Sequence, residues 1–360
     1  SKKYNIEIDY SCMIQLAAIA TTADVVPLVD ENRVITYFGL EQINQNPLAS
    51  IKKIFQLSNS SEISSSDLVF KVAPRINAAG RLSSANKATD FLISNNEQLE
   101  ILSTEIELIN KERREIDELI TQEALFQLST KPLERFTNLV FSTNWHKGVV
   151  GIVASRIIES YYKPTIVLTG EGDIITGSAR SVKDFDIYTV LERLKHYFIR
   201  FGGHKYAAGL SMKKTDLVAF FNDFENAVKK SIQTHMLIPK IKIDSELSID
   251  ELAKDSKTNN FPKIYRIIKQ MGPFGAGNPN PVFLFNCLKL HSTPKIVGEK
   301  HIKLKFCSNE LNSTIDAIWF NSFKSFDKIR TKKSLNVVAS LNENHFNGNI
   351  SLQLIVKDAK

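Results

Sequence analysis

A glycine pair followed by a histidine is the first stretch of this sequence whose residue types could do chemistry. Gly202 and Gly203 precede His204, and Lys205 adds a positive charge directly after it. Glycine lets the backbone take unusual conformations and approach a ligand closely. We predict a Gly-Gly-His turn here, whose backbone N–H groups, beside an imidazole and an ammonium group, would favour an anion such as a phosphate. The alternative is a glycine turn beside a core histidine that holds no ligand.

A second candidate combines hydroxyl groups with an arginine. Ser178 and Arg180 alternate along a predicted strand, and Ser181 follows them. Alternate residues of a strand point to the same face, so the first two side chains could hold one phosphate together. The alternative is an edge strand whose polar residues simply face solvent.

A third candidate is the segment 74–82, in which Arg75 and Arg81 flank Asn77 and an Ala-Ala-Gly bend. Arginine offers planar, multidentate contacts to phosphate oxygens. The alternative is a pair of surface arginines around a glycine that caps a helix.

His146 and Gly148 lie in a predicted turn between a strand at 138–142 and a helix at 149–158. A further strand at 164–168 completes a pattern that is typical of an α/β domain. The turn places His146 at a helix N-terminus, where unpaired backbone N–H groups favour anions.

Asp24 follows an apolar stretch at 12–20 and precedes a turn that contains Pro27. A carboxylate at the end of such an element is well placed to coordinate a metal ion. The alternative is an aspartate that only caps a helix or stabilises a turn.

The elements that must position these residues begin with a long helix. Residues 95–129 contain no glycine or proline and predict a single helix about 50 Å long, most simply a connector between domains. Its apolar residues recur at spacings of three and four, and Arg113 interrupts them: Leu99, Leu102, Ile106, Ile109, Ile116 and Ile120. A shorter helix is predicted over 31–43, with four residues facing inward: Val34, Tyr37, Phe38 and Leu40.

The C-terminal third of the chain predicts five short strands, at 282–290, 301–306, 314–320, 335–341 and 350–356. In the second of them, Lys303 and Lys305 alternate with apolar residues that would face a core. Five short strands with one basic face fit a small β-barrel of the OB type. The alternative is any other five-stranded sheet, since surface lysines often serve only solubility.

Composition bounds these interpretations. The chain has 360 residues, 43% of them hydrophobic and 24% charged, which suits a globular protein of two or three domains. The net charge of +7 favours a polyanionic partner. No apolar run reaches the ~18 residues of a membrane span. The three cysteines show no zinc or disulfide spacing, which indicates a reducing, cytoplasmic compartment.

The stretch RFGGHKYAAGLSM at 200–212 resembles the GGH segment of the DHHA1 domain in RecJ-type exonucleases, members of the DHH/DHHA1 phosphoesterase family. Further stretches resemble the same family in the same order, over nearly the whole chain: ATTADVVPL (20–28), PRINAAGRL (74–82), NWHKGVVGIVASRI (144–157) with GSARS (177–181), and MGPFGAGNPNPVF (271–283).

This resemblance implies a mixed α/β architecture in four parts. They would be the C-terminal part of a DHH phosphoesterase domain (1–93), a long interdomain helix (94–130), a DHHA1 α/β domain (131–236) and an OB-fold nucleic-acid-binding domain (237–360).

The resemblance also implies a single-stranded-DNA-specific 5′→3′ exonuclease of DNA repair and recombination that hydrolyses phosphodiesters with Mn²⁺ or Mg²⁺. Asp24 would be a catalytic metal ligand. The expected partners are single-stranded DNA with its 5′ end, a single-strand-binding protein and a helicase, and no membrane. The residues implied to contact nucleic acid are Arg75, Asn77, Arg81, His146, Ser178, Arg180, Ser181, Gly202, Gly203 and His204.

One motif of that family does not occur in this sequence. Its metal site also uses an Asp-His-His triplet, and the chain contains neither a His-His nor an Asp-His pair. Two-metal hydrolysis needs ions about 3.5–4 Å apart, which one carboxylate cannot hold. We therefore expect a chain that is N-terminally truncated relative to the family and inactive as a nuclease by itself. Two alternatives remain: a catalytically silent single-stranded nucleic-acid-binding protein, and a small-nucleotide phosphodiesterase, against which the C-terminal barrel argues.

Overall fold

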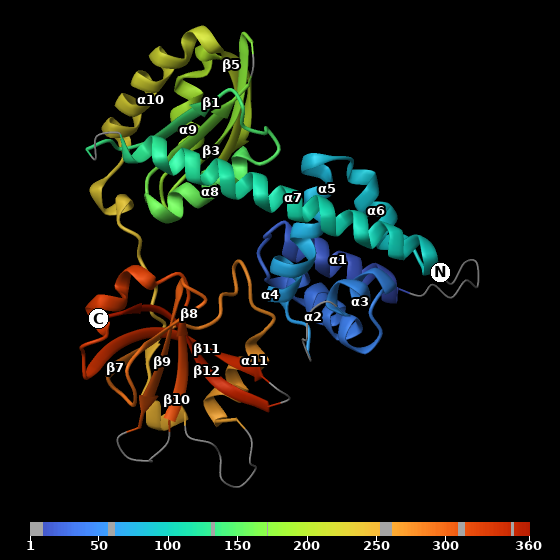
Figure 1. Cartoon of the computed structure of the whole chain (residues 1–360), viewed down its shortest axis with the longest axis vertical. Helices are drawn as coiled ribbons and strands as arrows, with labels where there is room; N and C mark the ends of the chain where they lie inside the picture. Colours follow the sequence, from blue (N-terminus) through green and yellow to red (C-terminus); the bar gives the residue numbers. More distant parts are fainter. Residues whose placement is uncertain are drawn as a thin grey trace. The chain divides into compact units, whose positions relative to one another are not determined.

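The computed structural model of the chain describes residues 10–56, 62–130, 134–170, 172–252, 261–308, 314–346 and 349–360. These residues fall into two compact units, one drawn from 1–73 and 241–360 and the other from 74–240. Figure 1 labels their helices and strands. Among the described residues, no helix is both long enough and apolar enough to span a membrane.

The first unit begins with helices that pack around a close contact. Gly39 lies against Ala18, and a Cβ added to Gly39 would be only 2.3 Å from the Ala18 Cβ. The predicted inward face of the second helix is wrong, because Val34 and Tyr37 are each 54% exposed. The glycine lets the neighbouring helix approach, so the face that contains Gly39 is the buried one. The elements are α1 (Ser11–Ala23), α2 (Asp30–Gln45), α3 (Ala49–Gln56), α4 (Ser65–Asp67) and a π-helical turn (Leu68–Val72).

The C-terminal part of this unit is a closed barrel. Its strands are β7 (Phe283–Leu290), β9 (His301–Cys307), β10 (Thr314–Trp319), β11 (Ser334–Phe346) and β12 (Asn349–Ala359). They pair in the order β7-β11-β12-β10-β9, and β9 returns to pair with β7. β10 and β12 are parallel, whereas their other pairings are antiparallel. The predicted OB-type barrel is confirmed.

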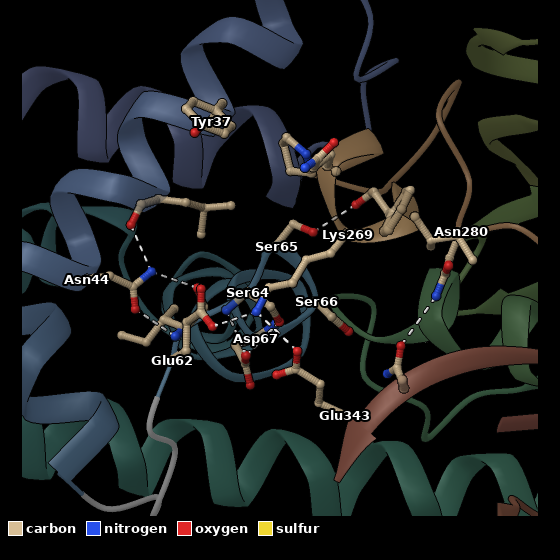
Figure 2. A pocket seen from close by; sticks show the side chains of 18 of the residues that line it. Tyr37, Asn44, Glu62, Ser64, Ser65, Ser66, Asp67, Lys269, Asn280 and Glu343 are labelled. Carbon is tan, nitrogen blue, oxygen red and sulfur yellow. Dashed lines mark hydrogen bonds and ion pairs between the residues drawn. The ribbon is translucent and has the colours of Figure 1, made fainter. Parts of the chain in front are cut away.

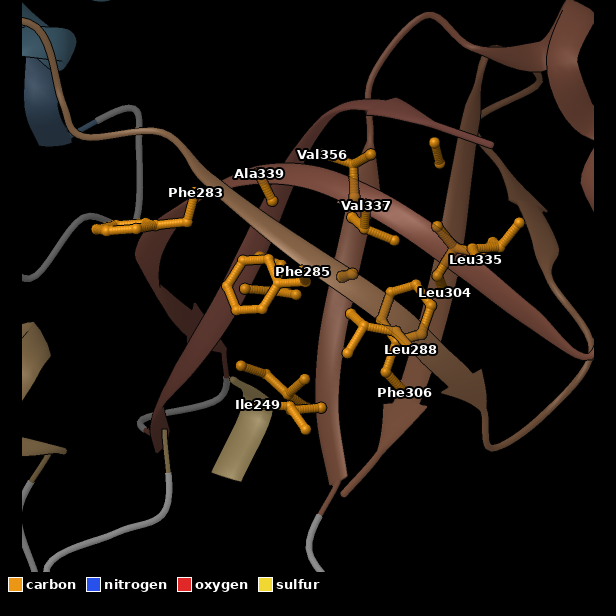
Figure 3. Close-up of a cluster of buried hydrophobic side chains, with 14 of the residues drawn as sticks. Ile249, Phe283, Phe285, Leu288, Leu304, Phe306, Leu335, Val337, Ala339 and Val356 are labelled. Atoms are coloured by element: carbon orange, nitrogen blue, oxygen red, sulfur yellow. The ribbon is translucent and has the colours of Figure 1, made fainter. Parts of the chain in front are cut away.

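Alternation along the strands fills the barrel, as Figure 3 shows. Phe285 and Phe306 are fully buried in the interior, whereas Lys303 points outward. The barrel is flanked by β6 (Ser245–Glu246), β8 (Lys295–Val297), α11 (Lys263–Met271) and α12 (Phe326–Ile329). The predicted inward and outward faces of the second barrel strand are therefore confirmed.

A loop at 271–280 joins the barrel to the N-terminal helices within this unit. The Leu28 N–H donates to the Ala276 carbonyl at 2.6 Å, and Arg33 Nη2 donates to the Met271 carbonyl at 3.0 Å. Gly275 packs on the Leu28 side chain, which is only 2% exposed. Two stretches singled out by the resemblance, 20–28 and 271–283, therefore meet in space.

Replacing Gly275 with valine should destabilise this unit by about 1–3 kcal/mol, the usual cost of overpacking. A Cβ at this position would lie 2.6 Å from Leu28 Cδ1, and the buried leucine has little room to move. Urea unfolding measures the loss. Pro279→Ala, at an exposed position of the same loop, is the matched control. Equal unfolding midpoints for the two variants would contradict this packing.

The second unit is a five-stranded sheet between two helical layers. The sheet order is β1-β2-β3-β5-β4, with β1 and β2 parallel and the other pairs antiparallel. Buried residues of α7 and α8 pack on one face, and those of α9 and α10 pack on the other. The elements are α5 (Ala73–Leu82), α6 (Ala85–Ile93), α7 (Asn96–Ser129), β1 (Asn138–Ser142), α8 (Val150–Ser160), β2 (Thr165–Thr169), β3 (Ile174–Arg180), α9 (Ile187–Arg193), β4 (Phe198–His204), β5 (Ala207–Lys213) and α10 (Leu217–Ser231).

The long helix α7 is confirmed, but its buried stripe is more polar than its apolar spacing predicts. Ile109 and Ile116 are only half-buried, whereas Asn110, Arg113 and Asp117 lie on the buried side. The three polar residues follow one another at spacings of three and four, so they continue the stripe through the middle of the helix. The contact between α7 and its neighbours therefore includes buried polar and charged side chains.

Candidate anion-binding site

β3 and the first turn of α8 bring Ser178, Arg180 and Gly151 together. Arg180 Nη1 donates to Ser178 Oγ at 2.9 Å and to the Ala179 carbonyl at 3.0 Å. A Cβ added to Gly151 would lie 3.2 Å from both Arg180 Nη2 and Ser178 Oγ. The predicted shared face of Ser178 and Arg180 is thus confirmed, and Gly151, which has no side chain, lets the first turn of α8 approach both side chains closely.

The register of the sheet aligns the two motifs that the sequence keeps apart. Ser178 pairs with Gly209, which pairs in turn with Gly202. Directly paired residues of adjacent strands share a face of the sheet. Gly202 and Gly209 have no neighbour within 4 Å of where a Cβ would lie. Two glycines therefore form an open floor of exposed backbone beside Ser178.

The next row of the sheet runs from Arg180 through Ala207 to His204. With strands about 4.8 Å apart, the two outer residues are separated by roughly 10 Å. The predicted glycine-histidine turn is wrong: this segment ends strand β4, and Lys205 and Tyr206 make the turn. Pairing with β5 explains this result, since a Cβ on Gly203 would be 2.4 Å from the Ala207 carbonyl oxygen.

Arg81 reaches the turn before α8. Its Nη1 donates to the Gly148 carbonyl at 3.1 Å, and the Gly148 N–H donates to His146 Nδ1 at 3.1 Å. A Cβ on Gly148 would lie 2.3 Å from the Arg81 carbonyl oxygen, so only glycine fits this contact. The segments 74–82 and 144–157 therefore meet at the N-terminal end of α8, as the position of His146 suggested.

The two arginines of this site, Arg81 and Arg180, have no carboxylate within ion-pair distance among the described residues. Burial lowers the pKa of Arg180, and the charge of Arg81 lowers it further, yet arginine remains protonated near neutral pH. The Val150 and Gly151 N–H groups in the first turn of α8 add unpaired donors. These groups suit an anion with several oxygens.

Replacing Gly151 with alanine should separate stability from anion binding. Alanine favours a helix by up to about 1 kcal/mol over glycine, which offsets the cost of a tight contact at 3.2 Å, so the variant should stay folded. Its Cβ would displace Arg180 Nη2 and Ser178 Oγ, and binding of a 5′-phosphorylated oligonucleotide should fall by about tenfold. Ser155→Ala, at an exposed position of the same helix, is the control. Fluorescence anisotropy measures the affinity, and thermal melting measures the stability. Unchanged affinity would contradict the assignment of an anion-binding site beside Gly151.

Three of the predicted contact residues are engaged or lie apart from this cluster. Arg75 forms an ion pair with Glu107 of α7. Asn77 is exposed on α5, which is a continuous helix rather than the predicted bend. Ser181 Oγ donates to the Phe185 carbonyl at 2.7 Å and stabilises the loop after β3. Their contacts with nucleic acid stay predictions.

Sequence reasoning missed Gly151 and Gly209 as site residues. Gly151 lies early in a helical pattern where glycine is unfavourable, which is a signal of a packing or functional need. Gly209 lay within a run of small residues, and only the strand register reveals its place between two motifs.

Asp24 lies in the first unit, directly after α1, where its N–H donates to the Ala20 carbonyl at 3.0 Å. The next residue, Val25, takes a left-handed conformation with φ 56°. A β-branched residue is strained there, and such strain gathers at functional sites. Among the residues the structure describes, no group of three or more His, Cys, Asp or Glu side chains could hold a metal ion. The described residues therefore do not complete a metal site around Asp24.

A cavity of about 1230 Å³ lies in the first unit and contains none of the predicted site residues. Figure 2 shows Lys269 reaching toward two carboxylates there. Its Nζ lies 3.2 Å from Glu62 Oε2 and 3.1 Å from Glu343 Oε1. Ser65 Oγ donates to the Phe274 carbonyl at 2.8 Å. Much of the polar lining is thus bonded to other parts of the same unit, and we interpret the cavity as part of its internal junction.

The barrel carries a second candidate surface where β10 ends. Phe320 and Phe323 are 52% and 53% exposed. The Phe320 ring meets the His301 ring edge-on at 5.1 Å, and the Phe323 N–H donates to the Lys300 carbonyl at 3.2 Å. Lys303 lies outward on the adjacent strand. Exposed aromatic rings beside lysines suit the bases and phosphates of a single strand.

Comparison with known proteins agrees with this architecture. The family model described as the DHHA1 domain matches residues 134–233, and the one described as the RecJ OB domain matches residues 243–358. The crystal structure of RecJ in complex with Mg²⁺ from Thermus thermophilus gives a TM-score of 0.80 at 25% identity, over 97% of this chain and 52% of that one. The mixed α/β layout, with these two domains, is therefore confirmed.

Curated relatives extend the similarity to the sequence. The single-stranded-DNA-specific exonuclease RecJ of Bacillus subtilis is 31% identical over 353 residues, which cover 96% of this chain and 44% of that protein. Its counterpart in Escherichia coli is 30% identical over 359 residues, which cover 96% of this chain and 60% of that protein. The chain thus spans about half the length of these relatives. Over almost its whole length it is a homologue of the RecJ single-stranded-DNA-specific exonucleases, with the DHHA1 and RecJ OB domains.

Proposed function

We propose that this chain binds the 5′-phosphorylated end of single-stranded DNA and acts in 5′→3′ exonucleolytic removal of nucleotides, in DNA repair and recombination. The observation that carries the proposal is the pair of guanidinium groups, Arg81 and Arg180, beside Ser178 and the first turn of α8, without a paired carboxylate among the described residues. A terminal phosphate offers more charge and more free oxygens than an internal one, so it suits this arrangement best.

Two further predicted residues, Gly202 and His204, extend the same surface of the sheet. The glycine floor of Gly202 and Gly209 lets a nucleotide approach the sheet, and His204 can donate or accept a hydrogen bond at its edge. The barrel, with Phe320 and Phe323, would hold nucleotides further from the 5′ end by stacking. A single-strand-binding protein and a helicase remain expected partners, and the cytoplasm the expected compartment.

For the hydrolytic step we propose a divalent metal ion, Mg²⁺ or Mn²⁺, with Asp24 as one ligand. The RecJ structures of Thermus thermophilus that match this chain are complexes with Mg²⁺ and Mn²⁺. Because the described residues contain no group of three or more His, Cys, Asp or Glu side chains that could hold a metal ion, we derive no step of the reaction through the metal. Such an ion would activate water and stabilise the leaving oxygen.

The binding proposal is tested with two oligonucleotides that differ only at the 5′ end. The chain should bind a 5′-phosphorylated single strand at least several-fold more tightly than the 5′-hydroxyl form, and less tightly as salt rises. Equal affinity for the two forms, or tighter binding of duplex DNA, would refute a 5′-end site.

A silent single-strand-binding protein is the second candidate, and it is compatible with the absence, among the described residues, of a group of three or more His, Cys, Asp or Glu side chains around Asp24. A nuclease assay of the purified chain with Mn²⁺ or Mg²⁺ distinguishes the two candidates. Release of mononucleotides from the 5′ end supports the exonuclease. Tight binding without release supports the silent binding protein.

A further inference from the structure

The contact between α7 and α8 buries an acidic residue that the proposed function does not use. Asp117 is fully buried, and its Oδ2 lies 2.8 Å from Arg156 Nη2 and 3.9 Å from Arg113 Nη1. Arg113 Nη2 in turn donates to Asn110 Oδ1 at 2.6 Å. One carboxylate of α7 therefore forms an ion pair with a guanidinium of α8, although Asp117 Oδ2 accepts no well-oriented hydrogen bond among the described residues, so the charge attraction holds the pair.

Such a pair is not explained by stability alone. Removing the Asp117 charge from water costs free energy that an ion pair often fails to recover, even though the Arg156 side chain stays 42% exposed, and apolar residues of similar volume serve as well. The neighbouring stripe of α7 shows that apolar residues fit there, since Ile106 and Ile120 are buried on the same side. Burial raises the pKa of Asp117, whereas Arg156 and Arg113 act to lower it. An ion pair at this position therefore calls for a role beyond packing.

Its place in the helix connects the pair to the anion-binding site. Arg156 follows Gly151 by five residues, which is about 7.5 Å along α8. Gly151 lies in close contact with Ser178 and Arg180, so a shift of α8 would change where the N–H groups of its first turn lie relative to these two side chains. A tether at Arg156 fixes both the rotation and the axial position of α8. Arg81 provides a second, electrostatic link. Its positive charge acts to lower the pKa values of Asp117, Arg113 and Arg180.

We propose that Asp117 is a positioning residue: through Arg156 it fixes α8 so that Gly151, Ser178 and Arg180 keep the geometry that binds a 5′-terminal phosphate. The proposal rests on the proposed 5′-end function. Asp117 itself touches no ligand, because its side chain is fully buried.

Two substitutions with opposite effects on charge test this role. Asp117→Asn makes the site one charge more positive, and Arg156→Gln makes it one charge less positive. Electrostatics alone predicts tighter anion binding for the first and weaker binding for the second. Positioning predicts that both weaken binding of the 5′-phosphorylated strand, on the order of tenfold, and leave binding of the 5′-hydroxyl strand nearly unchanged.

Further variants protect the test against simple unfolding. Arg156→Lys keeps the ion pair and should stay within about threefold of the wild type. The double variant Asp117→Asn with Arg156→Gln should bind no more weakly than Arg156→Gln alone, because both changes break one tether. Thermal melting confirms that each variant is folded.

The outcomes separate the two proposals. A wild-type chain that does not prefer the 5′-phosphorylated strand overturns the proposed function and this inference together. A wild type that keeps the preference, with an Asp117→Asn variant that binds equally well or more tightly, overturns the positioning role alone. Independent, additive losses in the double variant overturn it as well.

Discussion

Replacing Arg180 with glutamine should weaken binding of a 5′-phosphorylated single strand by about tenfold to a hundredfold, the range of a lost hydrogen bond to a charged group. Arg180 is a largely buried guanidinium with no paired carboxylate among the described residues. Its hydrogen bonds to Ser178 and to the Ala179 carbonyl leave its Nη2 directed toward the space beside Gly151. The same variant should bind the 5′-hydroxyl strand almost as well as the wild type.

Arg193→Gln is the matched control for this measurement. Arg193 ends α9, in the helical layer on the opposite face of the same sheet, so the substitution removes the same charge from the same unit. Anisotropy titrations with both oligonucleotides should show no change in the preference of this control. If both variants lose affinity equally, the effect is one of net charge, and Arg180 does not contact the terminal phosphate.

Local periodicity in the sequence was sufficient to predict one part of this site. Ser178 and Arg180 share a face because side chains alternate along any strand, whatever its neighbours are. The same rule correctly placed Lys303 outside the barrel. These predictions needed only one element at a time.

The rest of the site depends on pairing between elements. Gly202 and His204 look like a turn in the sequence, because two glycines favour one. In the fold they pair with Gly209 and Ala207, and this pairing aligns them with Ser178 and Arg180. The register of three strands is set by the whole sheet, so no local pattern could reveal it.

The helices show the same limit for burial. In α2 the more apolar face was expected inside, yet the absence of a side chain at Gly39 decides which face can approach α1. In α7 the central stripe holds Arg113 and Asp117, which pair with each other, and Asp117 also pairs with Arg156 of α8. A spacing rule that counts only apolar residues treats such positions as interruptions.

Replacing Phe320 and Phe323 together with serine should weaken binding of a long single strand by about 30-fold or more. Stacking of one base on an aromatic ring contributes roughly 1–3 kcal/mol, and two rings are lost. Both rings are about half exposed, and they follow β10 beside His301 and Lys300 at the start of β9. β9 and β10 are the second and third barrel strands, whose face binds oligonucleotides in OB folds. Affinity for a strand that is too short to occupy both the 5′-end site and the barrel should not change.

Phe126→Ser provides the control, because Phe126 is 71% exposed on α7 and has no stacking role in this proposal. Titrations with oligonucleotides of increasing length should show affinity rising with length for the wild type and for this control. In the Phe320/Phe323 variant the rise should flatten while the preference for a 5′ phosphate persists. This pattern would assign the preference for a 5′ end to the sheet and the preference for length to the barrel. An equal loss of affinity at every length would mean instead that the rings only stabilise the fold, since a structural defect would not distinguish short strands from long ones.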